Sequence, residues 1–301
     1  MKAFIWFIAV IAAAAAAIAA FTYPLWAALY PHFGFPFHRV ADRVGLVAFA
    51  VGFVLVVRRL KLADRASLGY GVRPVVFLRE LGVGFALGAP MMALVVAVMV
   101  ALGLLEWKPG VTIGAASLLA IAGVGLARGF AVALIEETFL RGAMFSGIAR
   151  ESGAKAAIVL TALLYGASHF VGHSHAVDAA PGWGSGLALL AASFGEFAHP
   201  LAIGDAYLSL FAVGVVLAMV RAETGHIGAC MGLHASWVWV ITFLRETSVA
   251  NRASPLAFLL SRFDGVVGWL VLGWTVLLGF ILYAFYSRRQ SRRGPVAPTA
   301  S

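Results

Sequence analysis

The sequence predicts an all-α protein that crosses a membrane several times, and three observations support this prediction. Of the 301 residues, 62% are hydrophobic and only 12% are charged, and the mean hydropathy is +0.95. A polytopic membrane protein has such a balance, whereas a soluble domain of this size does not. Several apolar runs reach the roughly 20 residues that a helix needs to span a bilayer. Glycine and alanine are abundant, which suits close contacts between membrane helices.

About eight transmembrane helices are expected, with a catalytic cavity within the bundle. In chain order they lie at about residues 3–30, 44–57, 81–105, 129–148, 156–171, 201–220, 227–244 and 266–286. An even number of spans places both termini on the same side of the membrane. We predict the bacterial inner (plasma) membrane, with both termini in the cytoplasm.

The charged residues agree with this topology. The net charge is +9, from 22 basic and 13 acidic residues, and much of the excess lies from Arg58 to Arg79 and after Arg288. Basic segments beside apolar runs mark the cytoplasmic side and attract anionic lipid headgroups. We therefore expect the lipid bilayer as a partner, and no nucleic acid. The single cysteine, Cys230, excludes an internal disulfide and a multi-cysteine metal site.

Two apolar runs do not fit a simple span. In the first, Ala17-Ile18-Ala19 resembles a signal-peptidase site, but the run continues to residue 29 and is long enough to span. Residues 111–148 are too long for one span, and Arg128 interrupts them. We expect an interfacial or partly buried helix there, followed by a span from about residue 129.

Two further segments are expected to be irregular. Residues 172–200 are predicted to form an external or re-entrant loop, and its histidines, His173, His175 and His199, are best explained as solvated side chains. Residues 288–301 are predicted to be a basic, disordered tail.

The most informative stretch runs from Leu134 to Gly142, where two carboxylates and a guanidinium interrupt an apolar run. A charged side chain at the bilayer centre costs about 2.5–3.5 kcal/mol on insertion scales, so three together indicate a function. On a helix, Glu137 and Arg141 share a face and can pair. Glu136 points about 100° away from Glu137 and stays available for proton chemistry.

Two histidines on other spans lie at a similar depth. Counted from the nearest cytoplasmic charges, Glu136, His169 and His234 lie 14, 14 and 13 residues into the membrane. At about 1.5 Å per residue this is roughly 20 Å, so the three side chains can converge. A carboxylate in apolar surroundings can activate water, one histidine can share the proton, and the other can stabilise an oxyanion. No cofactor is expected, although Glu136, His169 and His234 could instead bind zinc.

Three ordered motifs resemble a known family. They are Glu136-Glu137-x-x-x-Arg141, Tyr165-x-x-x-His169 and His234-Ala-Ser-Trp-Val238. They are similar to the Glu-Glu-x-x-x-Arg, Phe-x-x-x-His and His-x-x-x-Asn/Asp pattern of the CAAX prenyl protease 2 and bacteriocin-processing intramembrane proteases, often called CPBP or ABI. Lysostaphin-resistance-protein-A-like proteins are in the same family. The resemblance covers about residues 116–241.

The resemblance implies a role for each matched residue. Glu136 looks like the catalytic base, with His169 as its partner on the attacking water. Glu137 and Arg141 look like a supporting pair, and His234 looks like the donor on the oxyanion side. The implied activity is a CAAX-protease-like endopeptidase that cuts a membrane-anchored or lipid-modified protein or peptide.

Two positions depart from the family pattern. Tyr165 replaces the usual phenylalanine, which is a mild change, and Val238 stands where asparagine or aspartate is common. Valine can neither donate a hydrogen bond nor bind a metal, so the oxyanion site is weakened or completed elsewhere. Asp205, Ser236 and Tyr207 are candidates to complete it, although Asp205 is better explained as a structural polar contact. The missing ligand favours a glutamate-type, metal-free mechanism, although family members are commonly labelled metalloproteases.

The predicted organisation has four parts. Residues 1–110 form N-terminal transmembrane helices, 111–246 the family-like catalytic core, 247–287 a C-terminal transmembrane helix and 288–301 the tail. Two other functions stay open: a non-catalytic protein in bacteriocin-type immunity or partner binding, which Val238 favours, and a proton-coupled transporter. The absence of an internal repeat argues against the transporter. The sequence leaves the oligomeric state open.

Overall fold

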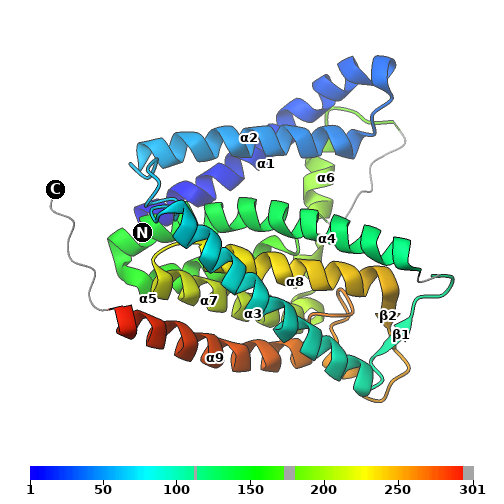
Figure 1. Cartoon of the computed structure of the whole chain (residues 1–301). Coiled ribbons are helices and arrows are strands. Elements are labelled where there is room, and N and C mark those ends of the chain that lie inside the picture. The colour runs from blue at the N-terminus through cyan, green and yellow to red at the C-terminus, as the bar shows by residue number, and fades with distance from the viewer. Residues whose placement is uncertain (112–113, 173–179, 294–301) are drawn as a thin grey trace.

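The computed structural model of the chain describes residues 1–111, 114–172 and 180–293 (Figure 1). Its helices are α1 Lys2–Phe33, α2 Phe37–Arg59, α3 Pro74–Ala101, α4 Ala115–Glu136, a π-helix Glu137–Met144, α5 Phe145–Ser168, α6 Ser185–Ser193, α7 Pro200–Thr224, α8 Gly228–Thr247 and α9 Trp269–Arg293. Two short 3₁₀ turns, Gly195–Ala198 and Ala257–Leu259, and two short strands, β1 Leu105–Trp107 and β2 Ser248–Ala250, complete the described elements. The predicted all-α class is confirmed.

Six helical segments in the described residues are long and apolar enough to cross a membrane, so the chain is an integral membrane protein. One of them, Ala115–Ser168, is 54 residues long and contains two of the expected spans. It turns at Gly153, whose φ of 81° is a left-handed conformation that glycine adopts readily. Helix α8, which covers another expected span, is not among the six, and most of its first half is buried.

The expected break at Arg128 is wrong. Helix α4 continues through this residue into the π-helix without interruption. The Arg128 side chain is 61% exposed and lies 3.9 Å from Glu246, so its charge sits on the helix surface. A surface arginine can keep its guanidinium out of apolar surroundings and need not end the helix.

The two ends of the bundle differ. The start of α1 and the end of α9 lie at one end, and β1 and β2 lie at the opposite end (Figure 1). The strands are antiparallel, with Glu106 opposite Val249. Strand β1 begins four residues after the end of α3.

Helix α8 packs closely against α3 because glycines line their contact. A Cβ atom at Gly232 would stand 2.1 Å from the Leu81 carbonyl oxygen, and one at Gly84 would stand 2.3 Å from that of Ala229. Real side chains do not tolerate such distances, so glycine is required on both helices. This contact fixes α8, which carries His234, inside the bundle.

The loop and the tail differ in part from the prediction. Residues 185–198 form α6 and a 3₁₀ turn, while His173 and His175 lie outside the described residues. Helix α9 continues to Arg293, so the beginning of the predicted disordered tail is helical, and residues 294–301 lie outside the described part. Arg221, one residue beyond the predicted span 201–220, is a buried residue of α7.

Candidate active site

A π-helix carries the conspicuous charged motif. It covers Glu137–Met144, and all of its residues except Thr138 are buried. π-helical turns are rare and often occur at functional sites, because they need support from tertiary contacts. Gly142 permits one such contact, since a Cβ atom there would stand 2.5 Å from the Leu68 carbonyl oxygen.

Glu137 binds two partners within this turn and across the bundle. Its Oε1 accepts hydrogen bonds from Arg141 Nη1 at 3.0 Å and from His234 Nδ1 at 2.8 Å. The side chains of Glu137 and Arg141 are both 0% exposed. The spacing-based pairing of Glu137 with Arg141 is therefore observed, while the bond to His234 was not foreseen.

Arg141 is held by further contacts. Its Nη2 donates to the Gly214 carbonyl oxygen on α7 at 3.3 Å, and its guanidinium carbon lies 4.5 Å from the centre of the Tyr165 ring. A carboxylate, a carbonyl and an aromatic face thus surround one buried cation, as such a charge requires.

Glu136 stands next to this pair but in a different environment. Its side chain is 32% exposed, and its Oε2 lies 3.9 Å from His234 Nε2, too far for a direct hydrogen bond. That oxygen is buried and has no hydrogen-bond partner among the described residues. The two neighbouring carboxylates therefore face opposite nitrogens of one imidazole ring, and the Glu136 oxygen remains available for a water molecule or substrate.

His169 is oriented by the aromatic residue one helical turn before it. Its Nδ1 lies 2.8 Å from the Tyr165 carbonyl oxygen, which can only accept, so Nδ1 carries the hydrogen and Nε2 is left as an acceptor. The Tyr165 ring packs edge-on against both histidines, at 4.6 Å from His169 and 5.9 Å from His234. Tyr165 thus contacts all three of Arg141, His169 and His234.

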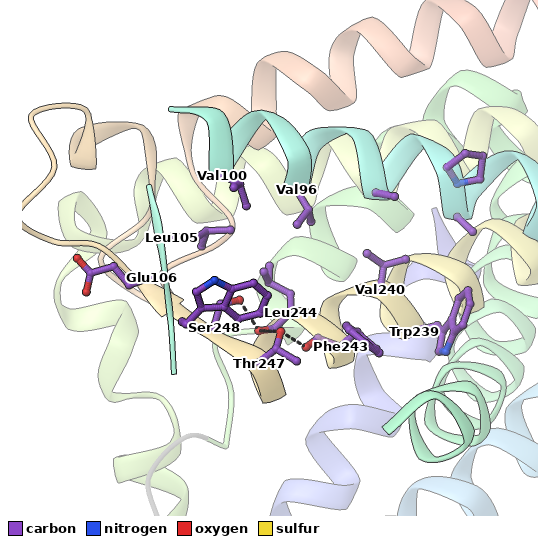
Figure 2. Close-up of a pocket in the computed structure, with 14 residues that line it drawn as sticks. Val96, Val100, Leu105, Glu106, Trp239, Val240, Phe243, Leu244, Thr247 and Ser248 are labelled. Atoms are coloured by element: carbon purple, nitrogen blue, oxygen red, sulfur yellow. Dashed lines mark hydrogen bonds between the residues drawn. The ribbon is translucent and has the colours of Figure 1, made fainter. Parts of the chain in front are cut away.

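A cavity of about 470 Å³ inside the bundle reaches these residues. Tyr165, His169, His234 and Val238 line part of it, and Arg128 and Glu246 line another part. A second cavity of about 870 Å³ lies between α3, α8 and β1, and its lining is mostly apolar (Figure 2). Of the five predicted site residues, His169 and His234 line the first cavity, and none lines the second.

The three candidates for completing the oxyanion site lie elsewhere. Asp205 Oδ1 accepts a hydrogen bond from Ser261 at 3.1 Å, and Ser236 Oγ donates to the Leu233 carbonyl at 2.7 Å. Tyr207 OH donates to the Leu163 carbonyl at 3.4 Å. None of the three lines the cavity that contains His234, whereas Val238 does. The replacement of the usual polar residue is therefore not compensated by these side chains.

The donor types at the site suit zinc, but their arrangement does not. Both histidines hold Nδ1 in a protein hydrogen bond and leave Nε2 free, which is the usual orientation of a metal-binding imidazole. Within the described ranges, however, no three side chains of His, Cys, Asp or Glu are grouped closely enough to share an ion. We derive no catalytic step through a metal.

Arg221 is a residue near the site that sequence reasoning missed. It is 8% exposed, and its Nε donates to the main-chain carbonyl of Arg141 at 2.9 Å. The only signal in the sequence is a charged residue directly after the predicted span 201–220. Its distance of 80 residues from Arg141 hid the contact.

Comparison with known proteins agrees with the motifs. Residues 117–240 match the family model described as Rce1-like, type II CAAX prenyl endopeptidase Rce1-like. Searches among curated proteins and among solved structures found no match. The matched segment contains all five predicted site residues, Glu136, Glu137, Arg141, His169 and His234. The family resemblance inferred from the three motifs is confirmed.

Proposed function

We propose that this chain, whose central segment matches the Rce1-like family of type II CAAX prenyl endopeptidases, hydrolyses a peptide bond of a membrane-anchored or lipid-modified protein. Glu136 acts as the base, His169 as its partner on the water, and His234 on the oxyanion side. The substrate is presented from the bilayer, because the site lies within membrane helices.

One observation carries this proposal. Glu136 has a buried oxygen without a protein partner, directed at the Nε2 edge of His234 at 3.9 Å. The adjacent Glu137 holds the other edge of the same ring. Glu137 also has one buried oxygen without a partner, Oε2, but its Oε1 accepts two hydrogen bonds, whereas no hydrogen bond to the Glu136 carboxylate is found among the described residues. An unpaired carboxylate beside an oriented histidine is suited to proton transfer.

The geometry supports the following sequence of steps. Glu136 takes a proton from a water molecule, whose other hydrogen is accepted by His169 Nε2. The hydroxide attacks the carbonyl carbon of the scissile bond, and the electron pair of the C=O bond moves to its oxygen. The C–N bond then breaks, and Glu136 returns the proton to the leaving amine. The products are a carboxylic acid and an amine, and the base is regenerated.

His234 can serve the oxyanion in its protonated form. Its Nδ1 then donates to Glu137, and its Nε2 donates into the cavity. Glu137 and Arg141 fix the ring orientation in advance, so little reorganisation is needed during the reaction. In the neutral ring, with the hydrogen on Nδ1, Nε2 could only accept.

Proteolysis in liposomes tests the proposal. Purified wild type, Glu136→Gln and His169→Ala are compared on a panel of membrane-anchored substrates, with and without a chelator. Glu106→Gln, in strand β1 at the other end of the bundle, is the matched control. We expect cleavage by wild type and the control, and a loss of about 100-fold or more in the two site variants.

Each outcome has a distinct meaning. Equal cleavage by Glu136→Gln would overturn the assignment of the base. Cleavage abolished by the chelator and restored by zinc would favour a metal-dependent mechanism. If no folded variant cleaves any substrate, the non-catalytic alternative gains weight, since Val238 leaves the cavity beside His234 without a polar side chain at that position.

A further inference from the structure

The π-helix is held from outside by groups that the proposed reaction does not use. Three contacts connect Arg221 of α7 to this turn and the one after it. Its Nε donates to the Arg141 carbonyl at 2.9 Å, its Nη2 to Ser146 Oγ at 3.4 Å, and its guanidinium carbon lies 5.4 Å from the centre of the Phe145 ring. Every contact identified for its side chain therefore reaches the stretch that carries the Glu137–Arg141 pair.

Arg221 is unusual because it is a buried cation without a carboxylate. It is 8% exposed, and no ion pair involves it in the part of the chain that the structure describes. A buried charge without a counterion is costly, and main-chain carbonyls compensate only part of that cost. A residue that only filled space here would be apolar. The carbonyl of Arg141 is the closest acceptor, so the main chain of the π-helix is what the cation binds.

The segment between α2 and α3 also contacts this stretch. Tyr70 OH lies 2.6 Å from Oγ1 of Thr138, the one residue of the π-helix that is only partly buried. Ser146 Oγ donates to the Ser67 carbonyl at 2.7 Å, and the Leu68 carbonyl lies against Gly142. Residues from other segments thus contact the π-helix near its beginning and middle, and contact α5 just after its end.

We propose that Arg221 and Tyr70 are positioning residues that hold the π-helix in register, so that Glu137 reaches His234. A relaxation of this turn to ordinary α-helix would change which side chains share a face, because an α-helix has fewer residues per turn. The 2.8 Å bond between Glu137 and His234 would then be lost while the helix itself remained. The inference that this affects catalysis rests on the proposed function.

The test combines hydrogen exchange with kinetics on the full chain in lipid micelles. Arg221→Met keeps the apolar bulk but removes the donors, Arg221→Lys keeps one donor, and Tyr70→Phe removes only the hydroxyl. Arg79→Met is the matched control, an arginine of α3 with a 56% exposed side chain. In Arg221→Met we expect amide exchange within residues 137–146 to accelerate at least tenfold, with the amides of the α3–α8 contact unchanged.

The kinetic readout separates positioning from mere stability. We expect Arg221→Met to lower kcat at least tenfold with KM within twofold, Tyr70→Phe to lower kcat a few-fold, and Arg221→Lys to recover part of the loss. Accelerated exchange with an unchanged kcat would overturn the positioning role.

The same experiment remains decisive if one variant does not fold or if the wild type cleaves no substrate. If Arg221→Met does not fold, Tyr70→Phe decides, since it removes only one atom from a half-exposed side chain. Unchanged exchange at residues 137–146 in every folded variant would overturn the proposal. If wild type cleaves no substrate, the proposed function fails, and the exchange measurement still decides whether the π-helix is held from these two sides.

Discussion

The two groups of ion pairs in this protein contrast sharply. At the π-helix, Glu137 and Arg141 are 0% exposed and His234 is 4% exposed. Toward the end of α8, the Arg128 and Glu246 side chains are 61% and 48% exposed, and Arg245 is 57% exposed beside Asp264. His234 of the first group and all four residues of the second line the same cavity, whereas Glu137 and Arg141 do not.

The contrast indicates that the buried charged residues have a role other than stabilising the fold. Exposed ion pairs contribute little and cost little, because water solvates the charges before and after pairing. Buried pairs must overcome a desolvation penalty of several kcal/mol per ion, so a hydrophobic replacement of both partners is often neutral or better. Retaining Glu137 and Arg141 at the π-helix is therefore better explained by the orientation they give His234 than by stability.

The largest expected effect is at the buried group. Glu137→Gln leaves the Arg141 cation buried without its counterion, which should destabilise the fold by about 3–5 kcal/mol. Reversible unfolding in mixed micelles measures this. Combining Glu137→Gln with Arg141→Met removes both charges and should recover most of the loss. A double variant as unstable as the single one would contradict the desolvation argument.

A smaller effect is expected from the apolar position in the same cavity. Val238 lines the cavity one helical turn after His234, and Val238→Asn would place an amide donor there. If the oxyanion site is incomplete, kcat should rise several-fold. In other enzymes, removal of one oxyanion donor lowers kcat by about 100-fold to 1,000-fold. Cleavage assays on the substrate identified with wild type provide the measurement, and Val238→Leu is the control for bulk. A decrease in kcat with intact folding would show that the site does not use this position.

The exposed group should respond much less. Arg245→Gln breaks a 3.0 Å ion pair with Asp264, and we expect a loss of no more than about 1 kcal/mol. The Asp264 carboxylate stays satisfied, because its Oδ1 also accepts from the main-chain amides of Val266 and Val267. The effect should shrink further at high salt. A loss as large as that of Glu137→Gln would erase the distinction between the two groups.

The smallest effect is a pH dependence in the segment between α2 and α3. Hydrogen bonds from the Ser67 hydroxyl and amide, aided by Arg150, hold the pKa of the Asp64 carboxyl below its ordinary value. Because the pKa is lower in the folded state, the stabilisation is present above the ordinary value and is lost as the pH falls through the folded value. The protection of the amides in residues 62–70, measured relative to the intrinsic exchange rate at each pH, should therefore fall in acid. Asp64→Asn should remove this pH dependence.

Much of the fold could be predicted because hydropathy is a local property. Each of the eight expected spans overlaps a helix, and Arg128 alone misled the reading of residues 111–148. That error arose because composition does not reveal which face of a helix a charge occupies. The antiparallel pairing of β1 with β2 joins residues more than 140 positions apart, so no local pattern could predict it.

The site was predictable in its members and not in its connections. The i,i+4 spacing predicted the pairing of Glu137 with Arg141. The similar depth of Glu136 and His234 in their spans predicted that they could converge. The hydrogen bond from His234 to Glu137 required the actual packing of α8 against the π-helix. His169 was predicted to lie at the site, but only its bond to the Tyr165 carbonyl identifies which nitrogen faces the cavity.

By itself, the sequence determined that this is a helical membrane protein and which charged residues lie inside its apolar runs, because burial of charge is costly wherever the chain folds. Only the tertiary structure decided that the motif adopts a π-helix and that Arg221 and Tyr70 contact it. A π-turn is unfavourable in isolation and forms where distant groups satisfy its main chain. Those groups are brought together by packing, which the local sequence does not encode.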